Sequence, residues 1–135
     1  MVVMDCSAAF EIAKGSPKGM GFKMLLDEGE PIIAPSFLFN EAANVAWKLT
    51  IFGDATREQA KGLLENALML IDDFVEPAPY YKEVYEAACQ NDHAAYDFFY
   101  LLLAKRNGAT LFTADKKLIQ LCEEMGVNTV AEIDF

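Results

Sequence analysis

Four acidic side chains occupy positions where a carboxylate could take part in chemistry. Asp5 directly follows the apolar run VVM, and Asp115 comes three residues after the end of the apolar run ATLF. Glu41 and Asp97 lie inside segments that are rich in aromatic and aliphatic side chains. Crowded carboxylates raise one another's pKa unless a divalent cation neutralises them, and such hard oxygen ligands suit Mg²⁺ or Mn²⁺ better than zinc. If these acids meet in the fold, they predict a magnesium or manganese site.

Each acid also has an ordinary explanation when it is taken alone. Asp97 falls near the start of a predicted helix, where the helix dipole favours a negative charge. The residues three and four positions away from it include no reliable cation, and His93 is interpreted as a surface residue at the helix start rather than a proton shuttle. Glu41 has apolar neighbours at helical spacing, yet a single acid of this kind is common on a solvated helix face. The coincidence of four such acids favours a shared site.

The segments that carry these acids alternate between strand-like and helix-like patterns. Strands are predicted at 2–4, 31–35, within 72–77, at 109–112 and at 127–130. Helices are predicted at 17–29, 61–71, 80–90, 93–106 and 114–125, and a further helix is predicted to begin after Ser36 as its cap. A capping box of Thr56 and Gln59 precedes the helix at 61–71, Pro79 precedes the one at 80–90, and Asp92 is the predicted cap of the one at 93–106. This order predicts an α/β fold, a three-layer α/β/α sandwich around a largely parallel sheet of four or five strands. Ligands bind such sheets beyond the carboxyl ends of the strands, where Asp5 and Asp115 fall.

Composition limits the class of protein. The 135 residues fit one domain, 1–135, and 53% of them are hydrophobic, which is ample for a packed core. No apolar run approaches the roughly 20 residues that span a membrane, and no basic segment opens a signal peptide. Three widely spaced cysteines, Cys6, Cys89 and Cys122, form no CxxC pair and indicate reduced thiols. We therefore expect a cytoplasmic protein with no membrane partner.

The quoted segments also resemble a known family. The stretches VVMDCSA, FNEAANVAW and AAYDFFYLLLAKRNGATLFTADKKL, with the spacing between them, are similar to the PIN-domain ribonucleases, particularly the VapC-type toxins of toxin–antitoxin pairs. The resemblance runs from residue 1 to about residue 130. It implies that Asp5, Glu41, Asp97 and Asp115 form a catalytic, metal-binding quartet, with Ser7 and Thr113 supporting the first and last acids and Asn44 beside Glu41 on its helix.

The activity implied by this resemblance is hydrolysis of RNA phosphodiester bonds by an endoribonuclease that depends on Mg²⁺ or Mn²⁺. The family further implies a homodimer and a cognate antitoxin protein. The net charge of −10 argues against generic nucleic-acid binding, so an RNA substrate needs bound cations and a local basic patch. Lys116 and Lys117 directly follow Asp115 and are candidate RNA contacts, although ordinary solvated surface explains such lysines equally simply.

Rival readings fit the residues less well. An aspartyl-phosphate phosphatase of the haloacid dehalogenase type would use Asp5 as nucleophile, but that family has a second aspartate where this chain has Ser7. A receiver-like module would need a phospho-accepting aspartate in mid-chain. A catalytically inactive PIN-like protein that only binds a partner stays open, although four intact acids argue against it.

Overall fold

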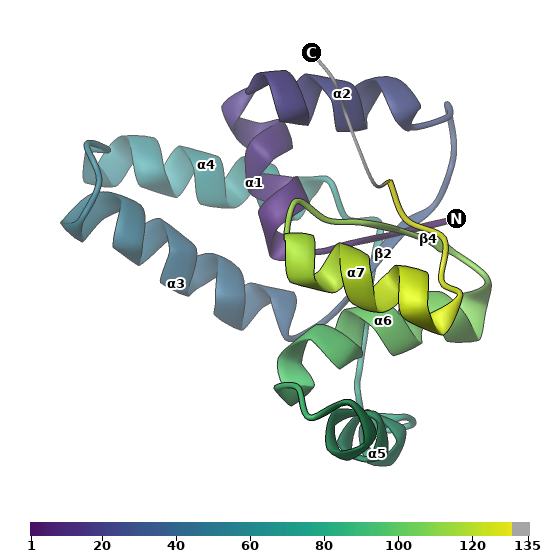
Figure 1. Cartoon of the computed structure of the whole chain (residues 1–135). Coiled ribbons are helices and arrows are strands. Elements are labelled where there is room, and N and C mark those ends of the chain that lie inside the picture. The colour runs from purple at the N-terminus through teal and green to yellow at the C-terminus, as the bar shows by residue number, and fades with distance from the viewer. Residues whose placement is uncertain (131–135) are drawn as a thin grey trace.

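The computed structural model describes residues 1–130. Four parallel strands form one sheet in the order β3-β2-β1-β4, and helices flank it (Figure 1). The strands are β1 (Val2–Met4), β2 (Ile32–Pro35), β3 (Asp73–Val75) and β4 (Thr110–Phe112). The helices are α1 (Cys6–Lys14), α2 (Pro17–Leu25), α3 (Leu38–Ile51), α4 (Arg57–Met69), α5 (Tyr81–Asn91), α6 (Ala95–Asn107) and α7 (Lys116–Met125). The predicted α/β class and the parallel sheet are confirmed.

The sheet has a hydrophobic core on each face. Successive strand residues point to opposite faces, so Val3 joins one core while Val2 and Met4 join the other. Helices α5, α6 and α7 cover the first face and pack on Val3, Ile33 and Leu111 of the strands. Helices α1, α2, α3 and α4 cover the second face, to which Phe112 of β4 also points. The arrangement is therefore three layers, helices on sheet on helices.

Strand β1 lies between β2 and β4 in the sheet, and the candidate site lies at its carboxyl end. It pairs with β2 on one side and with β4 on the other, and Met4 lies opposite Phe112. The backbone N–H of Asp5 then donates to the carbonyl of Phe112 at 3.1 Å. Because the two strands are parallel and in register, their carboxyl ends bring the residues that follow them side by side.

Two predicted helix caps are wrong for a backbone reason. Ser36 still belongs to the sheet edge, since its N–H donates to Val75 O at 2.9 Å, and α3 begins at Leu38 with no side-chain cap. Asp92 closes α5 instead of opening α6, with φ 46° in the left-handed region, and Ala94 stands at the start of α6. The capping box of Thr56 and Gln59 is present as predicted.

The ends of the sheet and of the first helix also differ from the sequence prediction. Residues 127–130 contribute only an isolated bridge between Leu111 and Thr129 rather than a fifth strand. Helix α1 was not predicted; Asp5 caps its start and Gly15, at φ 67°, ends it. Among residues 1–130, no helix combines the length and the apolar character that crossing a membrane requires.

Candidate active site

A pocket of about 280 Å³ opens beyond the carboxyl ends of β1 and β4. Its lining contains all four acids singled out in the sequence, Asp5, Glu41, Asp97 and Asp115. They come from four separate places: the end of β1, the first turn of α3, the first turn of α6 and the residue before α7. The pocket is completed by Cys6, Ser7, Asn44, Val45, Lys48 and Tyr100. The fold therefore brings together residues that are up to 110 positions apart in the chain.

Asp5 is the most buried of the four acids. Its side-chain Oδ1 accepts from the N–H of Ala8 at 2.9 Å and from the hydroxyl of Ser7 at 2.7 Å, while Oδ2 accepts from the hydroxyl of Thr113 at 2.5 Å. The bond to Ala8 caps α1, so the same carboxylate starts a helix and lines the pocket. Asp5 is thereby held rigidly at the pocket wall.

Thr113 connects the two strand-end acids. Its hydroxyl donates to Asp5 and accepts from the backbone N–H of Asp115 at 3.0 Å. Ser7 lies beside it, with its hydroxyl accepting from the N–H of Ala114 at 2.9 Å. The two predicted supports therefore form one hydroxyl pair between β1 and β4, and Thr113, only 1% exposed, contacts both acids rather than the last one alone.

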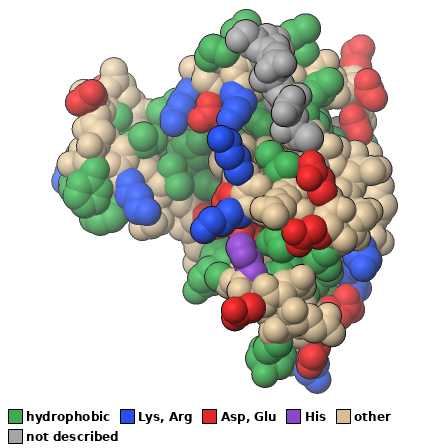
Figure 2. All heavy atoms as spheres, in the orientation of Figure 1, with side chains coloured by type: hydrophobic (Ala, Val, Ile, Leu, Met, Phe, Trp, Pro, Cys, Tyr) green, Lys and Arg blue, Asp and Glu red, His purple; other side chains and the backbone are tan. Residues whose placement is uncertain are grey.

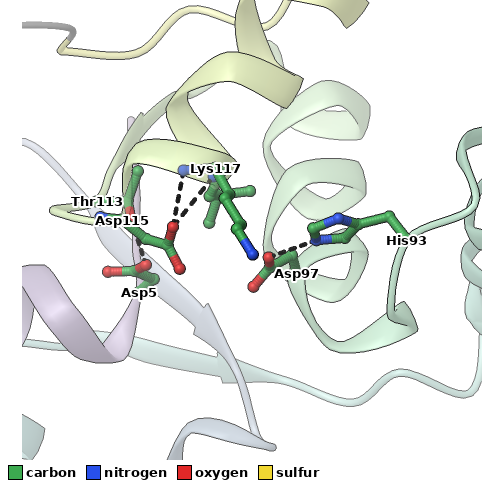
Figure 3. Close-up of polar contacts among 7 residues, drawn as sticks. Asp5, His93, Asp97, Thr113, Asp115 and Lys117 are labelled. Atoms are coloured by element: carbon green, nitrogen blue, oxygen red, sulfur yellow. Dashed lines mark hydrogen bonds and ion pairs between the residues drawn. The ribbon is translucent and has the colours of Figure 1, made fainter.

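Asp115 serves as the N-cap of α7. Its Oδ1 accepts from the backbone N–H groups of Lys117 at 2.8 Å and Leu118 at 3.4 Å (Figure 3). These N–H groups are the unpaired donors of the first helical turn, and the side chain satisfies them. Asp115 is thus fixed by the start of α7.

Glu41 and Asp97 each have one side-chain partner. The phenol of Tyr100 donates to Oε1 of Glu41 at 2.5 Å, which ties α6 to α3. Nε2 of His93 lies 2.8 Å from Oδ2 of Asp97 (Figure 3). His93 lies just before α6 with its side chain 23% exposed, in keeping with a residue at the helix start, and it also contacts an acid of the pocket at the i,i+4 spacing.

Three of the four acids keep one oxygen available. Glu41 uses Oε1, Asp97 uses Oδ2 and Asp115 uses Oδ1, and the other oxygen of each accepts no hydrogen bond from residues 1–130. Each of these acids therefore has one oxygen bound to the protein and one available to a ligand. Only Asp5 has both oxygens engaged.

Burial makes the pocket unfavourable for uncompensated negative charge. It raises the pKa of Asp5 to about 6, against the lowering effect of its hydrogen bonds. Burial also raises the pKa of Glu41, and the nearby Asp97 carboxylate adds to the effect. The Cys6 thiol has its pKa raised to about 12 by burial, so it stays protonated and is no nucleophile near neutral pH. A cation bound among the acids would relieve this repulsion.

Basic side chains lie near the acids. Lys48 on α3 lines the pocket itself, and Lys116 and Lys117 are exposed in the first turn of α7. The side chain of Lys117 extends toward Asp97 (Figure 3). Figure 2 shows Lys and Arg side chains close to His93 and to the acidic side chains beside it. The pocket rim therefore carries local positive charge on a chain whose net charge is −10.

The donor set suits a hard divalent cation. The available ligands are carboxylate oxygens, with the Asn44 amide in the same pocket. Among residues 1–130, no three His, Cys, Asp or Glu side chains are arranged to hold one ion by themselves. Mg²⁺ in proteins keeps several waters and takes only one or two direct carboxylates. The one or two direct carboxylates would come from the acids with an available oxygen, Glu41, Asp97 and Asp115, with Asp5 at the pocket wall.

The PIN-domain family model matches residues 2–124 of the chain. The chain belongs to the PIN-domain family. PIN domains are metal-dependent nucleases that typically bind divalent metals, and this agrees with the carboxylate pocket. The fold is similar to the crystal structure of PAE2754 from Pyrobaculum aerophilum, with a TM-score of 0.70 and 22% sequence identity over 98% of this chain and 89% of that one. The comparison with curated proteins finds no match.

Sequence reasoning missed some residues of this PIN-domain pocket. Tyr100 gave no local signal, because its partner Glu41 is 59 positions away. Lys48 also lines the pocket. The i,i+4 spacing of His93 and Asp97 could have indicated their contact. A search for cations near Asp97 passes over His93, because a histidine is a hydrogen-bond donor without a permanent charge.

Proposed function

We propose that this PIN domain is an endoribonuclease that uses Mg²⁺ or Mn²⁺ to hydrolyse RNA phosphodiester bonds, and that it acts as a VapC-type toxin. The observation that carries the proposal is the convergence of four carboxylates from distant parts of the chain on one pocket, three of them with an available oxygen. Acids on an ordinary solvated surface are hydrogen-bonded mainly to water, whereas each of these four carboxylates accepts a hydrogen bond from the protein.

The residues of the chain have distinct tasks in this reaction. A bound divalent cation lowers the pKa of a coordinated water and stabilises negative charge on the phosphate. Glu41, Asp97 and Asp115 offer oxygens for that cation, and Asp5, held by Ser7 and Thr113, offers negative charge at the wall. No histidine or cysteine nucleophile takes part.

Positive side chains are needed to admit RNA to an acidic protein. Lys48 lines the pocket, and the side chain of Lys117 extends from α7 toward Asp97 (Figure 3), so both can meet phosphate oxygens of a bound strand. Lys116 adjoins Lys117 in the same exposed turn. We propose Lys116 and Lys117 as RNA contacts, with Lys48 nearest to the reacting phosphate.

The toxin role requires protein partners. We propose a homodimer and a cognate antitoxin, supported by large apolar side chains that stay exposed at the end of α3 and just beyond it, with Trp47 51%, Ile51 58% and Phe52 76% exposed. Apolar side chains gathered in this way typically mark protein interfaces.

Cleavage of labelled RNA by the purified chain tests the activity. We expect Mn²⁺ or Mg²⁺ to support cleavage, EDTA to abolish it, and Asp115→Asn to remove it while keeping the helix cap that an asparagine also provides. The matched control is Asp54→Asn, an exposed acid in the α3–α4 connection that lies outside the pocket lining. A protein that binds an antitoxin-like partner but never cleaves RNA would instead be the inactive, partner-binding form of the family.

Growth of a bacterial host tests the toxin role separately. Expression of the parent chain is expected to arrest growth, and Asp115→Asn is expected to leave growth normal. Co-expression of the protein encoded beside this gene should restore growth. Cleavage in vitro without growth arrest would leave a metal-dependent ribonuclease and remove the toxin assignment.

A further inference from the structure

We propose that His93 is a positioning residue that sets the orientation of the Asp97 carboxylate for cation binding. The inference rests on the proposed metal-dependent function and adds a residue to that site. Its basis is one contact, Nε2 of His93 to Oδ2 of Asp97 at 2.8 Å, together with the way in which the imidazole itself is held.

The backbone holds His93 at a defined place. The left-handed turn at Asp92 ends α5, and the N–H of His93 then donates to the carbonyl of Ala88 at 3.2 Å. Ala94 is the cap residue of α6, so His93 lies just outside that helix and its ring reaches back onto the first turn. The connection between α5 and α6 therefore delivers the imidazole to Asp97.

The core holds the ring as well. His93 meets the ring of Phe98 edge-on, with centroids 5.7 Å apart and an interplanar angle of 88°. Phe98 is fully buried and cannot move away. The side chain of His93 is 23% exposed, so the imidazole is partly shielded and has a fixed support on one side.

The contact directs one carboxylate oxygen away from the pocket's acids. Figure 3 shows His93 approaching Asp97 from the side opposite to Asp5 and Asp115. A carboxylate only accepts hydrogen bonds, so Nε2 carries the proton in this pair and binds Oδ2. With Oδ2 engaged, the carboxylate plane is set, and Oδ1 is the oxygen left for a cation.

Asp97 depends on this partner more than the other acids depend on theirs. Asp5 has three donors, Asp115 has two backbone N–H groups, and Glu41 has Tyr100. Asp97 is not the cap of its helix, and His93 is its one hydrogen-bond partner among residues 1–130. Without the imidazole, a side chain that is 30% exposed would sample several rotamers.

His93 acts through Asp97 and does not enter the reaction. It is absent from the pocket lining, which includes Asp97 itself. A group that held or released a substrate proton would have to face the reacting phosphate. Partners of metal-binding carboxylates are known to affect metal affinity by about 10–100-fold.

The test compares His93→Phe with His93→Gln. Phenylalanine keeps an aromatic ring against Phe98 but has no donor, whereas glutamine supplies an amide donor that can reach a carboxylate at this spacing. Mn²⁺ binding to the metal-free proteins is measured by isothermal titration calorimetry, and thermal melting in EDTA confirms that each variant is folded. We expect His93→Phe to weaken Mn²⁺ binding about 10–100-fold and His93→Gln to restore most of it.

A second comparison shows whether the effect passes through Asp97. In the Asp97→Asn background, His93→Phe should change Mn²⁺ affinity no further, because the oriented carboxylate is already gone. Mn²⁺ affinity that is equal in the parent and in His93→Phe overturns the inference alone, as does a His93→Gln protein that binds as weakly as His93→Phe. Absence of Mn²⁺ binding by the parent overturns the proposed function and this inference with it.

Discussion

The phenol of Tyr100 donates to Glu41 Oε1 at 2.5 Å and so joins α6 to α3 at the candidate site. Burial raises the pKa of Tyr100, and the adjacent Glu41 carboxylate adds to that effect, so the phenol keeps its proton and acts only as a donor here. Glu41 is therefore held by a neutral partner that offsets little of its charge. This pair links the stability of the fold to the charge of the pocket.

Glu41→Gln is expected to stabilise the metal-free protein and to abolish its activity. The amide oxygen can still accept from Tyr100, while the charge disfavoured by burial is removed. The melting temperature in EDTA at pH 7.5 should rise, Mn²⁺ should no longer raise it, and RNA cleavage should fall by about 100-fold or more, since a direct ligand matters at least as much as its partners. Glu83→Gln, at an exposed ion pair with Arg106, is the control and should leave cleavage unchanged. A lower melting temperature for Glu41→Gln would contradict this account.

The stability of the metal-free protein should decrease as the pH rises from about 4 to about 6. Burial raises the pKa of Asp5 from 3.8 to about 6, so between these values the folded state binds more protons than the unfolded state. Through this group alone the free energy of unfolding falls by about 3 kcal/mol, and the loss is complete only when the pH is well above 6. Urea unfolding in EDTA across this range measures the effect. Asp5→Asn should flatten the Asp5 part of the curve, and an equal pH dependence in that variant would refute the assignment.

Thr113→Val should destabilise the protein and disturb two acids together. Valine has nearly the same shape, but it removes the donor to Asp5 and the acceptor for the Asp115 N–H. Leaving buried polar groups without partners costs about 1–3 kcal/mol each. Chemical denaturation measures the free energy of unfolding, and Thr113→Ser, which keeps the hydroxyl, should retain most of the stability. Equal losses in the serine and valine variants would show that the methyl group matters and the hydroxyl does not.

Lys117→Met should weaken RNA binding without weakening cation binding. The side chain extends toward Asp97 (Figure 3) and is proposed to contact a phosphate. Fluorescence anisotropy of single-stranded RNA, in an Asp115→Asn background that prevents cleavage, should show lower affinity and a salt dependence whose slope is smaller by about 0.7. Lys82→Met, on the exposed face of α5, is the matched control. An unchanged salt slope would place Lys117 outside the RNA path.

Sedimentation velocity tests the homodimer. The rings of Trp47 and Phe52 contact each other edge-on, with centroids 5.6 Å apart, at the exposed end of α3. We expect a dimer at high micromolar concentration for the parent and a shift toward monomer for Phe52→Asp, with little change in melting temperature because Phe52 is 76% exposed. Met24→Asp alters an equally exposed side chain on α2 and should stay dimeric. A monomeric parent would remove the proposal.

The sequence placed Asp5 and Asp115 well because their position follows from strand ends. Once β1 and β4 are parallel and adjacent, residues that follow them must be neighbours. Glu41 and Asp97 were recognised by their apolar surroundings, and both line the pocket. General rules about strands placed Asp5 and Asp115, whereas the grouping of all four acids in one metal site rested on their coincidence and on the resemblance to PIN domains, and it stays a prediction.

The partners of the acids and some element ends could not be predicted in the same way. The contact of Tyr100 with Glu41 depends on how α6 packs against α3, which no local pattern encodes. Ser36 is a good cap residue, but its N–H is used by Val75 in the sheet, so pairing between strands overrode the local preference. Residues 127–130 have strand-like composition, yet only one bridge forms beside β4.

The parallel pairing of β1 with β4 has a consequence for the order in which the chain is made. The ribosome adds Asp5 more than 100 residues before its partner Thr113 and the acid Asp115. A nascent chain that already contains β1, β2 and β3 therefore lacks one wall of the pocket. If the chain is a ribonuclease, each new copy gains a complete pocket only once β4 and α7 have been added.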